Sequence, residues 1–263
     1  MSVPVPFGQY VPGASPVHLL DARVKLVLVI AYVSMLFSAT DWRGLAIAVV
    51  AVFGALAISG VPVRLAARGL KPVAMLLAFT LLANALRLDS SGALISVGRL
   101  AVDMQGLRDG IFFVVRIIAL VLGTSLLTLT TSPVSLTDAL TRLMAPLRVV
   151  RVPTEDIAMM FSIALRFIPT TAEEAEKIVV AQTARGAVFD QGGPIRRARA
   201  WIPVLIPLFV NLFRRADDLA LAMESRCYTG TGRTRLHAPS MRPADWVVLC
   251  AGVTLSVAAS ILL

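Results

Sequence analysis

Two arginines stand near the ends of polar helical segments, and each is flanked by small residues. The two triplets consist of Ala184, Arg185, Gly186, Ser225, Arg226 and Cys227. Small neighbours let a helix end enter a groove, where a guanidinium can form two parallel hydrogen bonds with one carboxylate of a partner protein. Alternatively, both arginines remain in solvent and complement the partial negative charge at a helix C-terminus. The residue types alone leave both interpretations open.

Other chemistry-bearing patterns are missing from the sequence. Two cysteines and two histidines are too few for a disulfide framework or a cysteine-rich zinc site. The glycine-containing stretch 230–234 lacks the lysine of a phosphate-binding loop, and no metalloprotease or serine-hydrolase motif is present. We therefore expect a chain that is not an enzyme and that holds no cofactor or metal. Any ATP that it uses must be hydrolysed by another subunit.

Two helices are expected to position the arginines. The first runs roughly from Thr154 to Phe189, with Thr154 as a candidate N-cap and Pro169 dividing it into two parts. Gly186 marks its expected end, because glycine readily adopts the left-handed conformation that stops a helix. The second runs roughly from Pro203 to Tyr228, and the glycines after it end it.

The composition places these helices in a membrane protein. Hydrophobic types make up 57% of the 263 residues and charged types only 16%, whereas a soluble domain averages about half and a quarter. A membrane span needs about 20 mostly apolar residues. The sequence predicts about five spans, at Val24–Thr40, Leu45–Ser59, Pro72–Leu86, Ile111–Thr131 and Trp246–Leu263.

The positive charges indicate an orientation. With the N-terminus inside, the inner segments near the spans carry ten Lys and Arg residues and the outer loops carry four. The expected organisation is residues 1–131 with four spans, a cytoplasmic region at 132–243, and a last span at 244–263. The net charge of +9 fits an anionic lipid surface better than nucleic acid, because no basic stripe is interleaved with aromatic residues.

The spans offer little transport chemistry of their own. Arg116 is interpreted as a snorkelling arginine or, alternatively, as a functional group, and Asn84 as a partner in a hydrogen bond between helices. No acidic residue that could relay protons lies in a predicted span. A transporter that works alone on an ion gradient is therefore disfavoured.

The chain resembles a known family over nearly its whole length. Four blocks carry the resemblance to the transmembrane T component of energy-coupling factor (ECF) transporters, the EcfT/CbiQ family. They are Tyr10–Leu26, Thr131–Leu147, Leu165–Pro169 followed by Gln182–Gly186, and Ala222–Tyr228. In the first block this chain has Asp21-Ala22-Arg23 where the family usually has Asp-Pro-Arg.

The resemblance implies an all-α integral membrane protein with a cytoplasmic helical coupling region. In the family, two Ala-Arg-Gly motifs end two coupling helices, and each motif docks on one subunit of a pair of cytoplasmic ABC-type ATPases. Ala184, Arg185 and Gly186 match the first motif in full. At the second motif Arg226 is kept, while Ser225 and Cys227 replace alanine and glycine. If Cys227 must adopt a left-handed conformation, the cost is about 1–2 kcal/mol.

The resemblance therefore implies the T subunit of an ECF-type ABC importer in a prokaryotic inner membrane. The resemblance implies a small membrane substrate-binding S component as a further partner, and a vitamin or a transition-metal ion as cargo. ATP and magnesium would be bound by the partner ATPases. The alternatives are a stand-alone permease or channel, and a membrane scaffold without ATPase partners.

Overall fold

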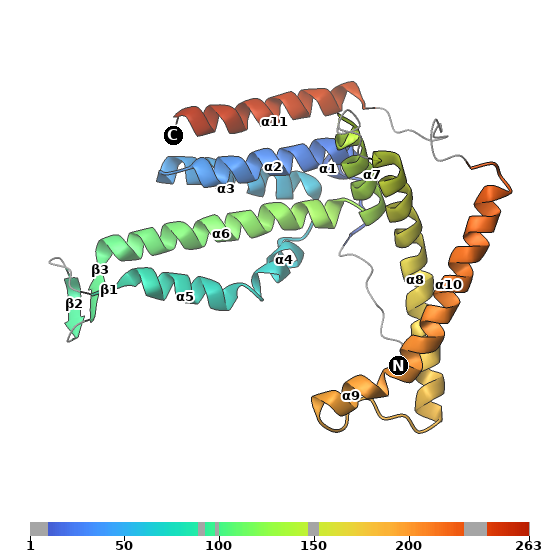
Figure 1. The fold of residues 1–263 in the computed structure, drawn as a ribbon. Coiled ribbons are helices and arrows are strands. Elements are labelled where there is room, and N and C mark those ends of the chain that lie inside the picture. Colours follow the sequence, from blue (N-terminus) through green and yellow to red (C-terminus); the bar gives the residue numbers. More distant parts are fainter. Residues whose placement is uncertain (1–9, 89–92, 98–99, 147–152, 229–240, 263) are drawn as a thin grey trace. The chain divides into compact units, whose positions relative to one another are not determined.

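The computed structural model describes residues 10–88, 93–97, 100–146, 153–228 and 241–262, and most of them are helical (Figure 1). The described chain divides into two compact units, with the boundary inside α7 (Pro133–Leu143). One unit holds the described residues of 10–140 and 241–262, and we call it the membrane unit. The other holds the described residues of 141–228 and contains both arginine triplets, and we call it the arm unit.

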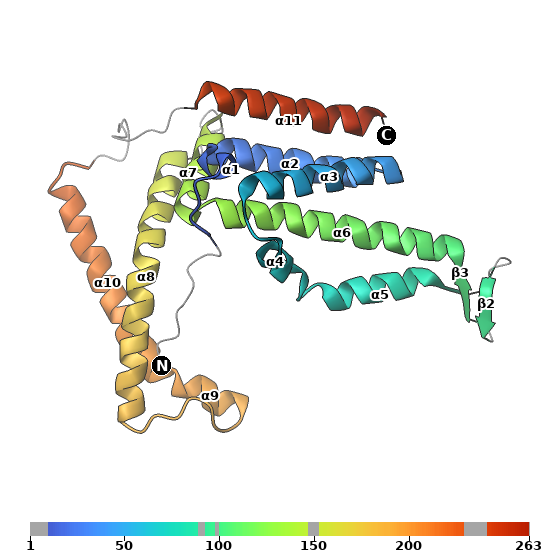
Figure 2. The ribbon, with the colours of Figure 1, turned by 180° about the vertical axis from the view of Figure 1, so that it is seen from behind.

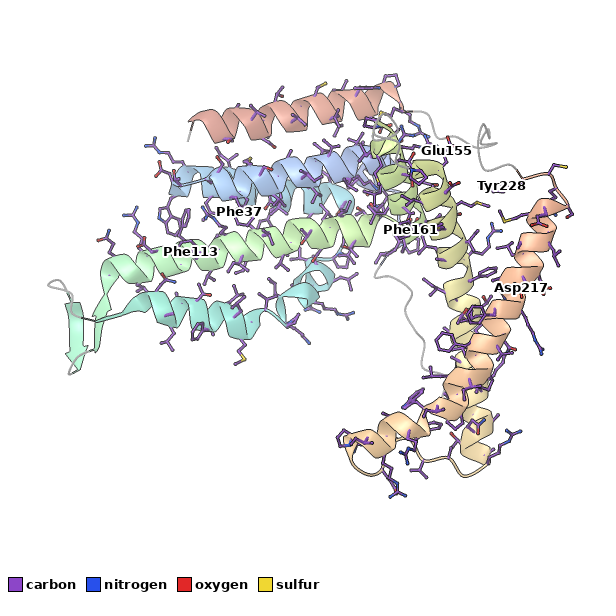
Figure 3. The ribbon with its side chains drawn as sticks, in the orientation of Figure 1. Phe37, Phe113, Glu155, Phe161, Asp217 and Tyr228 are labelled. Atoms are coloured by element: carbon purple, nitrogen blue, oxygen red, sulfur yellow. The ribbon has the colours of Figure 1, made fainter. Side chains whose placement is uncertain are left out.

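The membrane unit is built on three long helices that share an apolar core. Its helices are α1 (Pro16–Leu19), α2 (Ala22–Ser38), α3 (Trp42–Ser59), α4 (Val63–Ala66), the 3-10 helix η1 (Ala67–Leu70), α5 (Ala74–Ala85), α6 (Met104–Thr130) and α11 (Pro243–Leu262). Leu36 of α2, Leu45 of α3 and Ala119 of α6 are buried together at its centre. Many apolar side chains of this unit also face outward, such as Phe37 and Phe113, which are 64% and 41% exposed (Figure 3).

The outer helices lie against this core along their lengths. In both views α11 lies beside α2, and α5 lies beside α6 (Figures 1 and 2). Gly252 allows α11 to approach closely, because a Cβ at this position would lie 2.2 Å from Cδ2 of Leu28. Small residues at helix contacts are typical of membrane proteins, where close backbone approach replaces the hydrophobic effect as the source of attraction.

The all-α membrane class is confirmed, and a helix lies at each of the five predicted spans. Three described helices are long and apolar enough to cross a membrane, namely α3, α6 and α11. A fourth span results if the broken pair Val63–Leu70 and Ala74–Asn84, bent by 64°, crosses as one. The remaining helix, α2, has 17 residues, which is the lower limit of about 17 for a span.

The region around the third predicted span differs from the expected pattern. The stretch Ala67–Leu70, which lies just before the third predicted span, forms η1. Beyond α5 the backbone forms a small antiparallel sheet that the sequence did not predict, with strands β1 (Leu86–Leu88), β2 (Ala93–Val97) and β3 (Leu100–Asp103) in the order β1-β3-β2. Strands of three to five residues are too short to show a clear alternation of apolar and polar residues.

Two polar residues of the predicted spans have structural partners. Arg116 on α6 donates a hydrogen bond to the carbonyl oxygen of Ala39, the C-cap of α2, and its guanidinium lies 4.8 Å from the ring centre of Phe112. It therefore satisfies a carbonyl that the helix itself cannot pair. Asn84 was predicted to bond to another helix, and this is wrong for its amide nitrogen, which donates to the carbonyl oxygen of Thr80 one turn earlier at 2.9 Å.

Candidate functional site

The arm unit is organised around two long helices that run antiparallel, α8 (Thr154–Ala184) and α10 (Ile202–Glu224) (Figure 1). Their contacts establish the direction. Arg215 of α10 meets Glu174 of α8, while Gln182, further along α8, donates to the carbonyl oxygen of Pro203 near the start of α10 at 3.4 Å. The short helix α9 (Pro194–Ala200) lies in the connection between them.

Arg215 holds the two helices together near the middle of α8. Its guanidinium pairs with the carboxylate of Glu174 and donates to the hydroxyl of Thr170 at 3.2 Å. It also lies 5.5 Å from the centre of the Phe167 ring. The sequence does not reveal this cluster, because Arg215 is separated from its partners by more than 40 residues and no local pattern indicates the pairing.

Two expectations about α8 are wrong, one at its start and one at its middle. Thr154 is the first residue of the helix and not its N-cap, which is Pro153, a residue without a capping side chain. Glu155 and Asp156 lie in the first turn as expected, where the helix dipole favours acids. Pro169 lies inside one continuous helix and does not divide it. Proline removes one backbone hydrogen bond there, and the residues on either side of it, Phe167 and Thr170, contact Arg215 of α10.

The first arginine triplet forms a specific helix end. Gly186 has a φ of +87°, and its N–H donates to the carbonyl oxygen of Thr183 at 2.9 Å. The N–H of Ala187 donates to the carbonyl oxygen of Gln182 at 3.0 Å. This pair of hydrogen bonds is the Schellman motif, in which a left-handed residue turns the chain away from the helix axis. The prediction that the helix ends at Gly186 is confirmed.

The second triplet forms the same helix end with a cysteine in the glycine position. Cys227 has a φ of +56°, the only positive φ outside glycine among the described residues. Its N–H donates to the carbonyl oxygen of Glu224 at 2.9 Å, and the N–H of Tyr228 donates to the carbonyl oxygen of Met223 at 3.1 Å. Tyr228, labelled in Figure 3, directly follows this turn. Cys227 therefore adopts the left-handed conformation that glycine usually provides at this position.

The two helix ends present their arginines in equivalent places. Arg185 and Arg226 each stand one residue before the left-handed residue, and all six triplet residues are exposed. Neither arginine has an ion pair or a hydrogen bond from its side chain to another described residue. Because Gln182 lies beside the start of α10 and Arg226 lies beyond its end, the helical rise places the two arginines roughly 35 Å apart. They therefore form two separate points and not one site.

A cysteine in the left-handed region implies a measurable strain. We expect Cys227→Gly to stabilise the end of α10 by about 0.5–1 kcal/mol, the relief of strain less the entropy that glycine adds to the unfolded chain. Amide hydrogen exchange at Tyr228 should then slow by about threefold.

Gly186→Ala is the matched opposite change. A Cβ there would meet no atom within 4 Å, so its cost of about 1 kcal/mol is purely conformational. Equal exchange in both variants and the unaltered chain would contradict the strain.

No group of three or more His, Cys, Asp or Glu side chains that could hold a metal ion occurs in the described parts of the chain. The described chain contains a bundle of apolar helices and the two long helices α8 and α10, each of which is followed by an exposed arginine. This combination is that of a membrane protein with two exposed cationic helix ends.

The comparisons with known proteins identify the family. The CbiQ family, described as cobalt transport protein, matches residues 13–237, and the chain belongs to it. The chain is 45% identical over 254 residues to the energy-coupling factor transporter transmembrane protein EcfT of Thermosediminibacter oceani, covering 96% of each protein. It is 44% identical over 252 residues to the protein of that name from Brevibacillus brevis, covering 95% of each. It is therefore a transmembrane component of an energy-coupling factor transporter.

Proposed function

We propose that this chain is the non-catalytic coupling subunit of an ATP-driven importer. It joins two cytoplasmic ABC-type ATPases to a small membrane protein that binds the substrate, a vitamin or a transition-metal ion. ATP and magnesium are bound by the ATPases, and the chain lies in the cell membrane with its N-terminus inside. Residues 132–243 form the cytoplasmic coupling region of this proposal.

The observation that carries the proposal is the repeated geometry of the two helix ends. Arg185 and Arg226 are exposed, unpaired within the described residues, and held before a left-handed residue by the same two backbone hydrogen bonds. Two equivalent cationic ends fit two equivalent acidic grooves, as a pair of similar ATPase subunits would provide. Arginine suits this role because its guanidinium can bind one carboxylate through two hydrogen bonds.

A second surface suits the substrate-binding membrane partner. One face of α10 exposes large apolar side chains at intervals of three and four residues, so that they form a continuous stripe. We call this stripe the α10 apolar face, and it consists of Ile202, Leu205, Ile206, Phe209, Val210 and Phe213, which are 43–69% exposed. An apolar stripe of this kind fits another apolar protein surface better than water.

Movement of the arms would couple the two partners. When ATP closes the ATPase pair, docked helix ends must follow, and the Glu174–Arg215 contact transmits motion from one helix to the other. The α10 apolar face would then shift against the substrate-binding protein. In this proposal the arms have two packed arrangements. The ATPases bind nucleotide more tightly in one arrangement than in the other, and this difference in affinity supplies the energy for the shift.

The test is to purify the tagged chain from its native membrane in mild detergent and to identify its companions by mass. We expect an ATPase pair and one small hydrophobic membrane protein, whose identity would point to the substrate. Recovery of the chain alone, also in the presence of nucleotide, would contradict the proposal and favour a stand-alone permease or a scaffold. Direct binding of a substrate to the chain alone would favour the permease.

A further inference from the structure

The connection between α8 and α10 carries a basic cluster that the proposed function does not use. The helix α9 contains three exposed arginines, Arg196, Arg197 and Arg199, and no acidic residue. None of the three has an ion pair or a hydrogen bond from its side chain within the described part of the chain. Asp190 is the only acid in residues 187–202, so the segment carries a net charge of +2.

Exposed apolar side chains accompany these arginines. Ile195 is 78% exposed, the highest value among the large apolar residues of the arm unit, and Trp201 is 44% exposed. The ring of Trp201 packs against the ring of Phe189 across the base of the connection, with 5.1 Å between the ring centres. The Phe189–Trp201 contact therefore closes the connection into a loop, and Ile195 and the three arginines are exposed on this loop.

The arginines also border a hollow that suits an anionic group. Arg196 and Arg199 lie one turn apart and line a shallow depression of about 380 Å³ together with Gly193, Pro194 and Ile195. Two guanidinium groups beside an apolar side chain can hold a phosphate while the apolar group enters a hydrocarbon phase. Tryptophan next to such a cluster is typical of a segment at the boundary between membrane and water.

We propose that α9 and Trp201 form a membrane-surface anchor that binds the headgroups of anionic phospholipids. The arginines pair with lipid phosphates, while Ile195 and Trp201 enter the outer part of the acyl region. A bilayer fits better than an acidic protein surface, because a carboxylate partner explains the arginines but leaves Ile195 in water. The inference does not depend on the docking of ATPases at Arg185 and Arg226.

The test uses the fluorescence of Trp201 in the full chain reconstituted in vesicles. The sequence has three tryptophans, so Trp42→Phe and Trp246→Phe leave Trp201 as the only one. Vesicles of brominated phosphatidylcholine with or without phosphatidylglycerol report the depth of the ring, because bromine quenches tryptophan only on close approach. We expect strong quenching in the vesicles with phosphatidylglycerol and weak quenching in those of phosphatidylcholine alone.

The arginines are tested by two triple variants in the same background. Arg196→Gln, Arg197→Gln and Arg199→Gln together should remove most of the quenching, because each charge at an anionic surface favours the bound segment by about fivefold and three by about a hundredfold. The matched lysine variant, which keeps the charge at all three positions, should retain it. A folded arm unit in the glutamine variant is verified by unchanged circular dichroism.

Three outcomes would overturn the anchor. Equal quenching with and without phosphatidylglycerol would show that the arginines contribute nothing. Equal quenching in the glutamine and lysine variants would show the same. The third outcome concerns acrylamide, which quenches tryptophan from the water. If acrylamide quenches Trp201 freely in anionic vesicles but not in native membranes that contain the complete transporter, this surface binds a protein partner.

Discussion

The Arg185→Glu, Arg226→Glu double variant is expected to be recovered from the membrane without the ATPase subunits that we propose for the unaltered chain. Both side chains are exposed and stand at helix ends of the same geometry. If each forms a pair with a carboxylate in a groove, reversal replaces two attractive contacts with two repulsive ones. Removing one partner of a buried charge pair costs about 2–5 kcal/mol, which lowers an association constant by about 30- to 5,000-fold.

The single variants separate the two docking points. We expect Arg185→Glu to weaken ATPase association at least as much as Arg226→Glu, because its triplet has both of the small residues that the family motif contains. Arg185→Lys keeps the charge but not the two-pronged geometry, so an intermediate loss would indicate a bidentate contact. The measurement is the amount of ATPase that is purified with each tagged variant relative to the tagged chain.

The control for this experiment is a charge reversal elsewhere on the same helix. Arg214 on α10 is exposed, makes no ion pair among the described residues, and lies three turns before the helix end. Arg214→Glu makes the same change of charge and should leave ATPase association unaltered. If the double variant retains its ATPases in full, the arginines are solvated helix ends and the docking role is wrong.

The sequence predicted the end of α8 at Gly186, because a helix stops for local reasons, but it placed the end of α10 at Tyr228, four residues beyond the observed end at Glu224. Gly186 and Cys227 adopt left-handed conformations, and the glycine at the first of these positions already indicated the break. The resemblance supplied the further point that a cysteine stands where glycine is usual, and the observed φ of +56° confirms the conformation. The roles of Arg185 and Arg226 stay a prediction, since they concern other proteins.

Features that depend on distant contacts could not be predicted in this way. Arg116 was interpreted from its depth in an apolar segment, yet its position is explained by the carbonyl of Ala39, 77 residues earlier. Pro169 was expected to divide α8, because a proline inside a helix usually disturbs it, but α8 runs through it as one helix whose neighbouring Thr170 contacts α10. The sheet of β1, β2 and β3 depends on pairing among short strands, which sequence periodicity does not reveal.

Lys25 is the strongest case of a residue whose role required the structure, and its removal should have the largest effect on stability. Its side chain is buried, with 7% exposed, in the membrane unit. The amino group donates to the carbonyl oxygen of Thr130 at 2.9 Å and to that of His18 at 3.2 Å. Thr130 ends α6 and His18 lies in the last turn of α1, so neither carbonyl has a partner within its own helix.

One ammonium therefore caps two helices and ties both to α2. A positive charge at a helix C-terminus is also favoured by the helix dipole. Lys25→Met keeps an unbranched side chain of similar length but leaves the buried carbonyl of Thr130 without this donor. A hydrogen bond to a charged group contributes about 1.5–3 kcal/mol, and an unsatisfied buried group adds a penalty. We expect a loss of about 3 kcal/mol in the free energy of unfolding.

The measurement is thermal unfolding in detergent, followed by the fluorescence of Trp42 and Trp246 in a Trp201→Phe background, so that the signal reports the membrane unit. For a chain of this size about 3 kcal/mol corresponds to a lowering of Tm by roughly 6–12 °C. Lys71→Met is the matched control, because Lys71 is exposed and its loss should change Tm by no more than about 2 °C. Equal melting of the two variants would show that the contacts of Lys25 contribute nothing to stability.

The same variant also separates stability from docking. Lys25 lies in the membrane unit, whereas Arg185 and Arg226 lie in the arm unit. Below its lowered Tm, the Lys25→Met chain should therefore carry its ATPase partners in the same amount as the unaltered chain. The Arg185→Glu, Arg226→Glu chain should show the opposite pattern, with an unchanged Tm and no ATPases. If both variants changed both quantities together, loss of the fold would explain the loss of partners, and the helix ends would not need a docking role.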